Sequence, residues 1–153
     1  MENDDFAQTP GSSKKDLENI RRDVQAFLTG ESLGIQHNKI LKTYMTFLDS
    51  VLRQEASAED LTAIVQDMVS YLTLHFVSEE SLMNLTAYPE ADHHRLRHRG
   101  FLDEVERLVT EIRIGQQTYD ALAAAAGLWM LDHERTFDAD LAAFLAARPD
   151  AAG

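Results

Sequence analysis

Two pairs of potential metal ligands flank a break between two helical stretches. His75 and Glu79 lie four residues apart. After Pro89, His94 and His98 repeat that spacing. Residues four apart share one face of an α-helix, one turn above the other. Imidazoles and a carboxylate that converge between neighbouring helices are what a buried transition-metal site requires. The sequence therefore predicts two adjacent helices that face each other across a metal site.

Apolar residues follow a helical period in four long stretches of the chain. The stretches cover residues 32–53, residue 57 to the Tyr88-Pro89 break, residues 91–112 and residues 119–146. Short connections make successive helices antiparallel neighbours. The expected fold is all-α, an antiparallel up-down-up-down four-helix bundle.

An extra short helix is expected before the bundle. Ser13 and Asp16 form a capping pattern, and Leu17, Ile20 and Val24 follow at helical spacing. We expect this helix to pack on the bundle, although residues 13–29 could instead bind a partner protein or form a homo-oligomer. The expected organisation is a polar tail and short helix over residues 1–30, the bundle over 31–147, and a frayed C-terminus over 148–153.

Composition excludes several classes of protein. The net charge of −12 would repel nucleic acid and anionic lipid, so we expect neither a nucleic-acid nor a membrane partner. No stretch reaches the length of an apolar membrane span, and the N-terminus lacks a secretory signal. The absence of cysteine excludes disulfides, iron–sulfur clusters and thiolate zinc sites, which favours a cytoplasmic location.

The remaining helices add two histidines at the same level of the bundle. His37 lies one turn into the first long helix, and His133 lies in the second half of the fourth. In an antiparallel bundle both positions map to the end that holds the first two pairs. Five of the six histidines would then share one layer of the core. His93 is expected on the surface, and Glu80, rotated by about 100° from Glu79, is expected in solvent.

The donor set suggests the kind of metal. A carboxylate on the core face needs a cation, because an unpaired buried charge is costly. Five imidazoles indicate a late first-row metal and are too many for one open zinc site. Two metal ions bridged by carboxylates fit the count, although ligand type alone leaves iron and manganese open.

The chain resembles the hemerythrins, in particular the bacterial ones. The resemblance rests on four motifs in matching order and spacing, which span residues 36–138: Gln36-His37, His75-Phe76-x-x-Glu79-Glu80, Tyr88-Pro89-Glu90 before His94-x-x-x-His98-x-x-Phe101, and Trp129-x-x-x-His133-x-x-x-x-Asp138.

The resemblance implies a non-haem site of two iron ions joined by an oxo or hydroxo group. One iron would have three imidazole ligands, His94, His98 and His133. The other iron would have two imidazole ligands, His37 and His75, and a vacant position. The carboxylates of Glu79 and Asp138 would bridge the two ions. The implied function is reversible binding of dioxygen.

Spacing and resemblance disagree at one residue of this set. Five residues after His133, Asp138 would point about 140° away on a regular α-helix. If the resemblance holds, the helix must contain a π-bulge or a break between these two residues. The chain also departs from the family pattern at Gly34, where an Asp is common, and at Met130, where a Leu often lines the dioxygen pocket. A third departure is the helix at residues 13–29, where an extended arm is common.

We expect an oxygen carrier, store or delivery protein and not an enzyme. Neutral imidazoles add no negative charge that would stabilise ferric iron, whereas carboxylate-rich ferritin-like sites favour oxidation chemistry. Few residues follow the fourth helix, which also favours a carrier. The alternatives are a sensor of dioxygen or nitric oxide that signals through a partner, and a di-iron peroxidase or oxidase.

Overall fold

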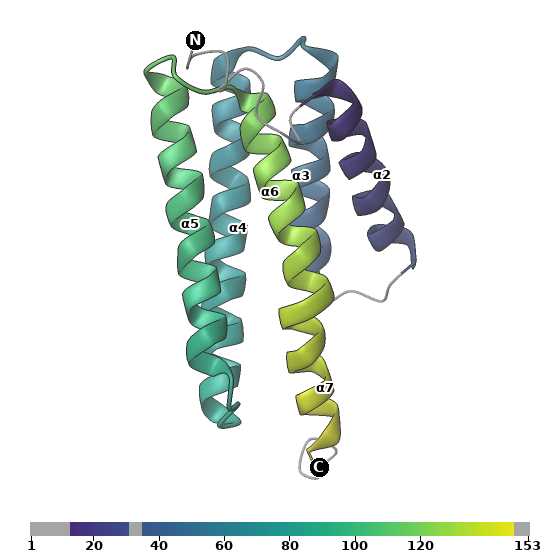
Figure 1. The fold of residues 1–153 in the computed structure, drawn as a ribbon, viewed down its shortest axis with the longest axis vertical. Helices are drawn as coiled ribbons and strands as arrows, with labels where there is room; N and C mark the ends of the chain where they lie inside the picture. Colours follow the sequence, from purple (N-terminus) through teal and green to yellow (C-terminus); the bar gives the residue numbers. More distant parts are fainter. Residues whose placement is uncertain (1–12, 31–34, 149–153) are drawn as a thin grey trace.

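The protein is a ring of four antiparallel helices with a fifth helix on its outside, seen in a computed structural model that describes residues 13–30 and 35–148 (Figure 1). The helices in chain order are α2 (Lys14–Gly30), α3 (Ile35–Arg53), α4 (Ala58–Leu85), α5 (Ala91–Arg113) and α6 (Tyr119–His133). A π-helical turn, η1 (Glu134–Asp138), and α7 (Ala139–Ala147) continue the direction of α6.

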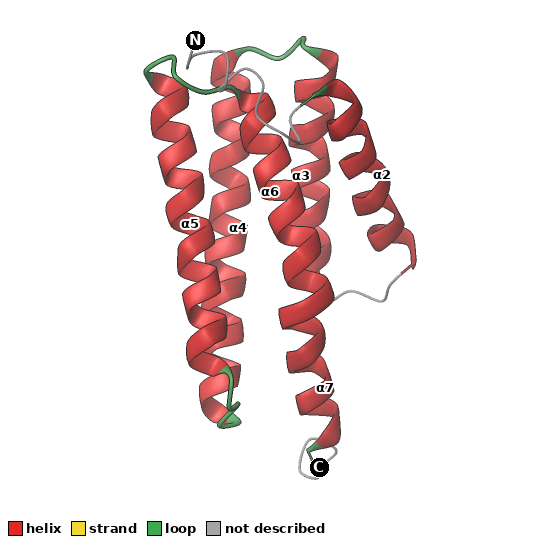
Figure 2. Ribbon diagram, in the orientation of Figure 1, coloured by secondary structure: helices red, strands yellow, loops and turns green. Residues whose placement is uncertain are grey.

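Every regular element in residues 13–30 and 35–148 is helical (Figure 2). The expected all-α bundle with an extra N-terminal helix is therefore confirmed. No helix in these residues is both long and apolar enough to cross a membrane. Three expected segments fall on residues outside the described part of the chain. They are the polar tail (residues 1–12), the start of the first long stretch (31–34) and most of the frayed C-terminus (149–153). Arg148 donates a hydrogen bond of 2.7 Å to the Thr86 carbonyl oxygen.

Hydroxyl side chains begin three of the helices. The Asp16 backbone N–H donates to Ser13 Oγ (3.1 Å), and the Asp60 backbone N–H donates to Ser57 Oγ (3.0 Å). Thr118 accepts in the same way at the start of α6. These contacts satisfy backbone donors that have no partner within the first turn of a helix. Local sequence thus fixes where α2, α4 and α6 start.

The apolar face of α2 is buried against α3 and α6. Leu17 and Val24 have no exposed surface, and Ile20 is 4% exposed. Burying an aliphatic side chain of this size contributes about 1.5–3 kcal/mol to the free energy of folding. The expectation that this helix packs on the bundle is confirmed, and only its polar face remains on the surface.

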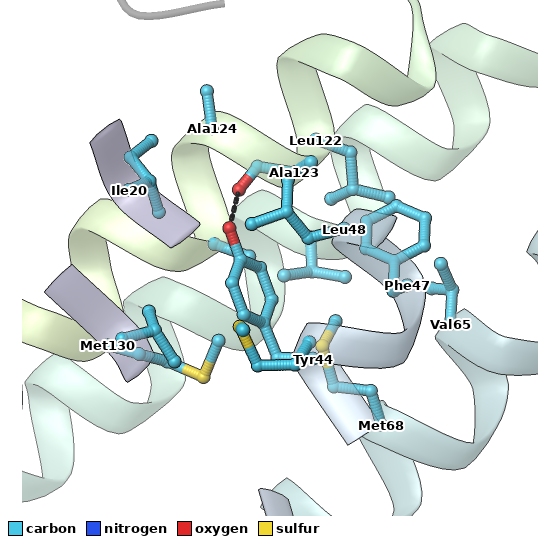
Figure 3. Packing of buried hydrophobic residues seen from close by; sticks show 14 of the residues in the cluster. Ile20, Tyr44, Phe47, Leu48, Val65, Met68, Leu122, Ala123, Ala124 and Met130 are labelled. Carbon is cyan, nitrogen blue, oxygen red and sulfur yellow. Dashed lines mark hydrogen bonds between the residues drawn. The ribbon is translucent and has the colours of Figure 1, made fainter. Parts of the chain in front are cut away.

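A tyrosine ties α3 to α6 at the place where α2 crosses them. Tyr44 is fully buried, and its hydroxyl donates a hydrogen bond of 2.6 Å to the Ala123 carbonyl oxygen (Figure 3). Burial raises the pKa of Tyr44, so the phenol stays protonated and able to donate. Gly127 leaves room for this ring, since an added Cβ would lie 2.6 Å from Ile20 Cγ2 and closer still to the Tyr44 hydroxyl oxygen.

We expect Gly127→Ala to destabilise the protein by roughly 1–3 kcal/mol, because α2 and Tyr44 must move to admit the methyl group. Urea unfolding monitored by circular dichroism measures this change. The control is Gly100→Ala, where an added Cβ meets nothing within 4 Å. That substitution should leave stability unchanged or raise it by up to about 1 kcal/mol through helix propensity. A Gly127 variant as stable as the Gly100 variant would contradict the close-packing account.

Two apolar clusters enclose one polar layer of the bundle. The main core includes Phe76 of α4 and Phe101 of α5. A smaller cluster at the other end of these helices contains Met83, Tyr88, Ala91 and Leu141. Glu79 falls between the two clusters along α4, and the pair of histidines on α5 falls between them in the same way. Apolar packing above and below therefore shields the polar layer from water.

Candidate metal centre

All seven side chains that the sequence predicts as metal ligands meet in this layer. They come from five successive elements: His37 (α3), His75 and Glu79 (α4), His94 and His98 (α5), His133 (α6) and Asp138 (η1). Their donor atoms form two groups that share Glu79, and within each group all atoms lie within 4.8 Å of one another. The layer is thus a candidate metal site with two halves.

The halves differ in the number of histidines and in exposure. In the larger half, His133 Nε2 lies 3.0 Å from His94 Nε2 and 3.2 Å from His98 Nε2. These three side chains are 1–4% exposed. In the smaller half, His37 Nε2 lies 2.6 Å from His75 Nε2, and the two side chains are 20% and 12% exposed. Solvent therefore reaches the two-histidine half more easily.

Glu79 faces both halves. Its Oε1 atom lies 3.0 Å from His94 Nε2 and 3.1 Å from His98 Nε2. Its Oε2 atom lies 3.4 Å from His75 Nε2. One carboxylate oxygen is thus directed at each half, as a bridge between two metal ions requires.

Asp138 has the same double orientation. Its Oδ1 atom lies 3.1 Å from His133 Nε2 and 3.3 Å from His94 Nε2, and its Oδ2 atom lies 3.6 Å from His37 Nε2. The side chain can turn inward because residues 134–138 form a π-helical turn, in which hydrogen bonds join residues five apart. Its side chain is 8% exposed. The predicted π-bulge is confirmed, and it removes the conflict between helical spacing and resemblance.

Comparison with known proteins finds several relatives of this chain that carry the same name. Over 104 residues the chain is 26% identical to proteins named bacteriohemerythrin from Pseudomonas paraeruginosa and Pseudomonas aeruginosa, covering 68% of this chain and 67% of theirs. A bacteriohemerythrin from Stenotrophomonas maltophilia is 25% identical over 105 residues, which are 67% of this chain and 66% of that protein. The chain is hemerythrin-like. No protein-family model matches it, and no solved structure gives a significant match.

The buried atoms of the hemerythrin-like site suit a metal. Glu79 Oε1 and Asp138 Oδ1 are buried, and neither accepts a hydrogen bond from any described residue. A buried carboxylate oxygen without a hydrogen-bond donor is costly unless a cation compensates it. Imidazole nitrogens and carboxylate oxygens are also suitable donors for iron and similar metals. The residues present therefore fit a metal centre.

Glu80 contradicts the expectation that it would lie in solvent. Its side chain is 29% exposed, and Oε2 lies 2.9 Å from His98 Nδ1. A carboxylate on the outer nitrogen of a ligating imidazole fixes the ring orientation and raises its basicity. Periodicity on α4 alone could not show this contact, because the partner belongs to α5. The sequence did hold one signal for this contact, because Glu80 lies four residues after Phe76 and so shares its helix face. The Phe76 ring stacks on His98, with centroids 3.8 Å apart.

Aromatic rings hold other imidazoles of the hemerythrin-like site in place. His133 lies between two nearly parallel rings, with centroid distances of 4.4 Å to Trp129 and 5.4 Å to Phe137. The sequence prediction that His93 lies on the surface is confirmed, and its ring contacts the edge of Phe137. Rings fixed in this way lose little conformational entropy when a metal binds.

The pKa values of three histidines in the site bear on metal uptake. Burial lowers the pKa of His37 and His133, which favours the neutral imidazole that a metal needs. Burial acts the same way on His94, but the adjacent carboxylates of Asp138 and Glu79 outweigh it and raise its pKa to about 9. A metal ion would have to displace that proton, so uptake should release protons.

Sequence reasoning also missed Glu134. Its Oε2 atom lies 3.4 Å from His37 Nε2, and its side chain is 14% exposed. Burial, together with Asp138 and Glu79, raises the pKa of Glu134 to about 8. A usable signal was its spacing of four from Met130, which is buried on the same side of the helix. Both residues line a cavity of about 20 Å³ beside the two-histidine half.

Two residues that depart from the family pattern remain, Met130 and Gly34, and the structure describes only Met130. Met130 is 3% exposed and lines the cavity, so a thioether stands at the edge of the two-histidine half. Gly34 lies outside the described residues. The cavity has room for about one water-sized molecule.

We expect Glu80→Ala to weaken metal binding by about 10–100-fold, the usual cost of losing an outer partner of a ligating histidine. Glu80→Gln should lose less, because its amide oxygen can still accept from His98 Nδ1–H. Competition against a chelator of known affinity measures the change. Asp67→Asn, which removes an exposed charge from the same helix, is the control. Equal affinity in wild type and Glu80→Ala would contradict the proposed role.

Proposed function

We propose that this protein binds two iron ions through the seven predicted ligands and binds dioxygen reversibly at the pair. The observation that carries the proposal is the double orientation of Glu79 and Asp138, each with one oxygen toward each half of the site. Similarity to proteins named bacteriohemerythrin supports the same reading. An iron pair would supply the electrons that dioxygen takes up on binding and returns on release.

The donor set supports reversible binding over oxidation chemistry. Five of the seven ligands are neutral imidazoles, and only two carry negative charge. Such a set stabilises ferric iron less than the carboxylate-rich sites of ferritin-like oxidases. The more exposed two-histidine half, with its adjoining cavity, is the side from which a small ligand would enter.

Metal analysis combined with absorption spectroscopy tests the proposal. Purified protein should contain close to two iron ions per chain, and a visible absorption band should appear in air and vanish on deoxygenation. Reloading with manganese and with iron in parallel distinguishes the two metals. A protein that retains no metal, or a spectrum that oxygen does not change, would exclude reversible dioxygen binding.

We favour a carrier, store or delivery role, with a sensor as the second candidate. One contact favours a sensor: the Arg135 guanidinium of η1 lies over the Phe27 ring of α2, 5.7 Å from its centre. A change in the π-helical turn could thus reach α2, whose polar face would meet a partner or a second copy. Size-exclusion chromatography of the oxygenated and deoxygenated forms tests this, since a carrier should show no difference in assembly.

Peroxidase or oxidase activity is the remaining alternative. Steady-state consumption of hydrogen peroxide by the iron-loaded protein, compared with an equal concentration of free iron, tests it. We expect no turnover above that of free iron, because the proposed role is binding and release without catalysis.

A further inference from the structure

Glu134 is a buried acidic side chain that the motifs of the family resemblance leave without a role. It directly follows His133 and is the first residue of η1. The π-helical turn that brings Asp138 inward thus begins at a second carboxylate. Both side chains line the cavity beside the two-histidine half.

The distances place Glu134 as close to this half as the two expected bridging carboxylates. Glu134 Oε2 lies 3.4 Å from His37 Nε2. The corresponding distances are 3.6 Å from His37 Nε2 to Asp138 Oδ2 and 3.4 Å from His75 Nε2 to Glu79 Oε2. Three carboxylates therefore approach the two imidazole nitrogens to similar distances.

Glu134 nevertheless stands at the edge of the donor set. The compact group of donor atoms within 4.8 Å of one another contains His37, His75, Glu79 and Asp138. Glu134 is not in that group, and its side chain is more exposed than those of the two bridging candidates, at 14% against 8%. A ligand that approaches from the open side can leave without disturbing the others.

No lysine or arginine among the described residues forms an ion pair with the three carboxylates. Among the ion pairs formed by the described residues, Glu79, Glu134 and Asp138 pair only with histidines. Burying three acidic groups together is costly unless metal ions compensate their charge. A metal ion in the two-histidine half would therefore attract the third carboxylate as well.

We propose that Glu134 is a displaceable third carboxylate ligand of the metal ion in the two-histidine half, so that an external ligand binds there by displacing it. This inference rests on the proposed function. Glu134 would lower the apparent affinity of the site for any small ligand, because only the molecules with the carboxylate withdrawn could bind it. It would also protect the metal ion from solvent when no ligand is present.

Azide titration of the oxidised, iron-loaded protein tests the inference through absorption spectra. The variants are Glu134→Gln, which removes the charge, and Glu134→Asp, which keeps the charge but shortens the reach. If Glu134 occupies the position in about nine tenths of molecules, both variants should bind azide about tenfold more tightly than wild type. The control Asp140→Asn removes an exposed charge from the next turn and should match wild type.

The outcomes separate this inference from the proposed function. Wild-type protein without two metal ions per chain would overturn both. Wild type with two ions, and the same azide affinity in all variants, would overturn only the role of Glu134. A tighter Gln variant with a wild-type-like Asp variant would indicate a charge effect at a distance and would also overturn it. Loss of one ion from both variants would identify a permanent ligand and overturn displacement.

Discussion

Removing the metal with a chelator is expected to lower the melting temperature by roughly 10 °C. A ligand that binds only the folded state at about a thousand times its dissociation constant stabilises that state by about 4 kcal/mol. For a domain of about 150 residues, each kcal/mol shifts the melting temperature by about 2–4 °C. Differential scanning calorimetry of the metal-loaded and stripped protein measures the difference.

Reloading provides the control for this prediction. Adding iron under anaerobic conditions should restore the higher melting temperature, whereas adding magnesium should not, because magnesium prefers oxygen ligands and this site is rich in imidazole. Equal melting temperatures before and after stripping, with metal loss verified by elemental analysis, would leave a bundle held by apolar packing alone.

Glu79→Ala is expected to abolish binding of both metal ions. Its two oxygens are directed at different halves, so the substitution removes one ligand from each half and leaves Asp138 as the one bridging carboxylate. The loss should exceed the 10–100-fold cost of an outer partner, and a weakening of at least about a hundredfold is expected. Elemental analysis after gel filtration measures the ions retained per chain.

His75→Ala is the informative comparison, because it removes a ligand from the two-histidine half alone. It should retain close to one ion per chain while Glu79→Ala retains close to none. Two ions in the Glu79 variant would exclude a bridging role for this carboxylate. Equal losses in the two variants would indicate that the halves fill only together.

Short-range patterns in the sequence predicted the bundle and the imidazole layer. Apolar residues at helical spacing select one face of each helix, and short connections make neighbours antiparallel. His75 and His94 are placed by those two rules alone, since they lie on core faces at the same end of an antiparallel pair. The Ser13 and Ser57 caps are equally local, because each donor lies three residues from its acceptor.

The positions of three acidic side chains depended on interactions beyond that local period. Asp138 ends a turn whose wider winding breaks the helical period, so counting along a regular helix misplaces it, whereas Glu80 and Glu134 contact residues of other helices. The family resemblance, and not the spacing, indicated Asp138.

The sequence by itself determined the helices, their antiparallel order and the level at which five histidines meet, because these follow from periodicity within each segment. Only the tertiary structure decided what Glu80 and Glu134 contact. The partner of Glu80 is on α5 and that of Glu134 is on α3, and no regularity within one helix specifies the side chains of another. Burial beside those partners, a property of the packed bundle, gives these carboxylates their place around the site.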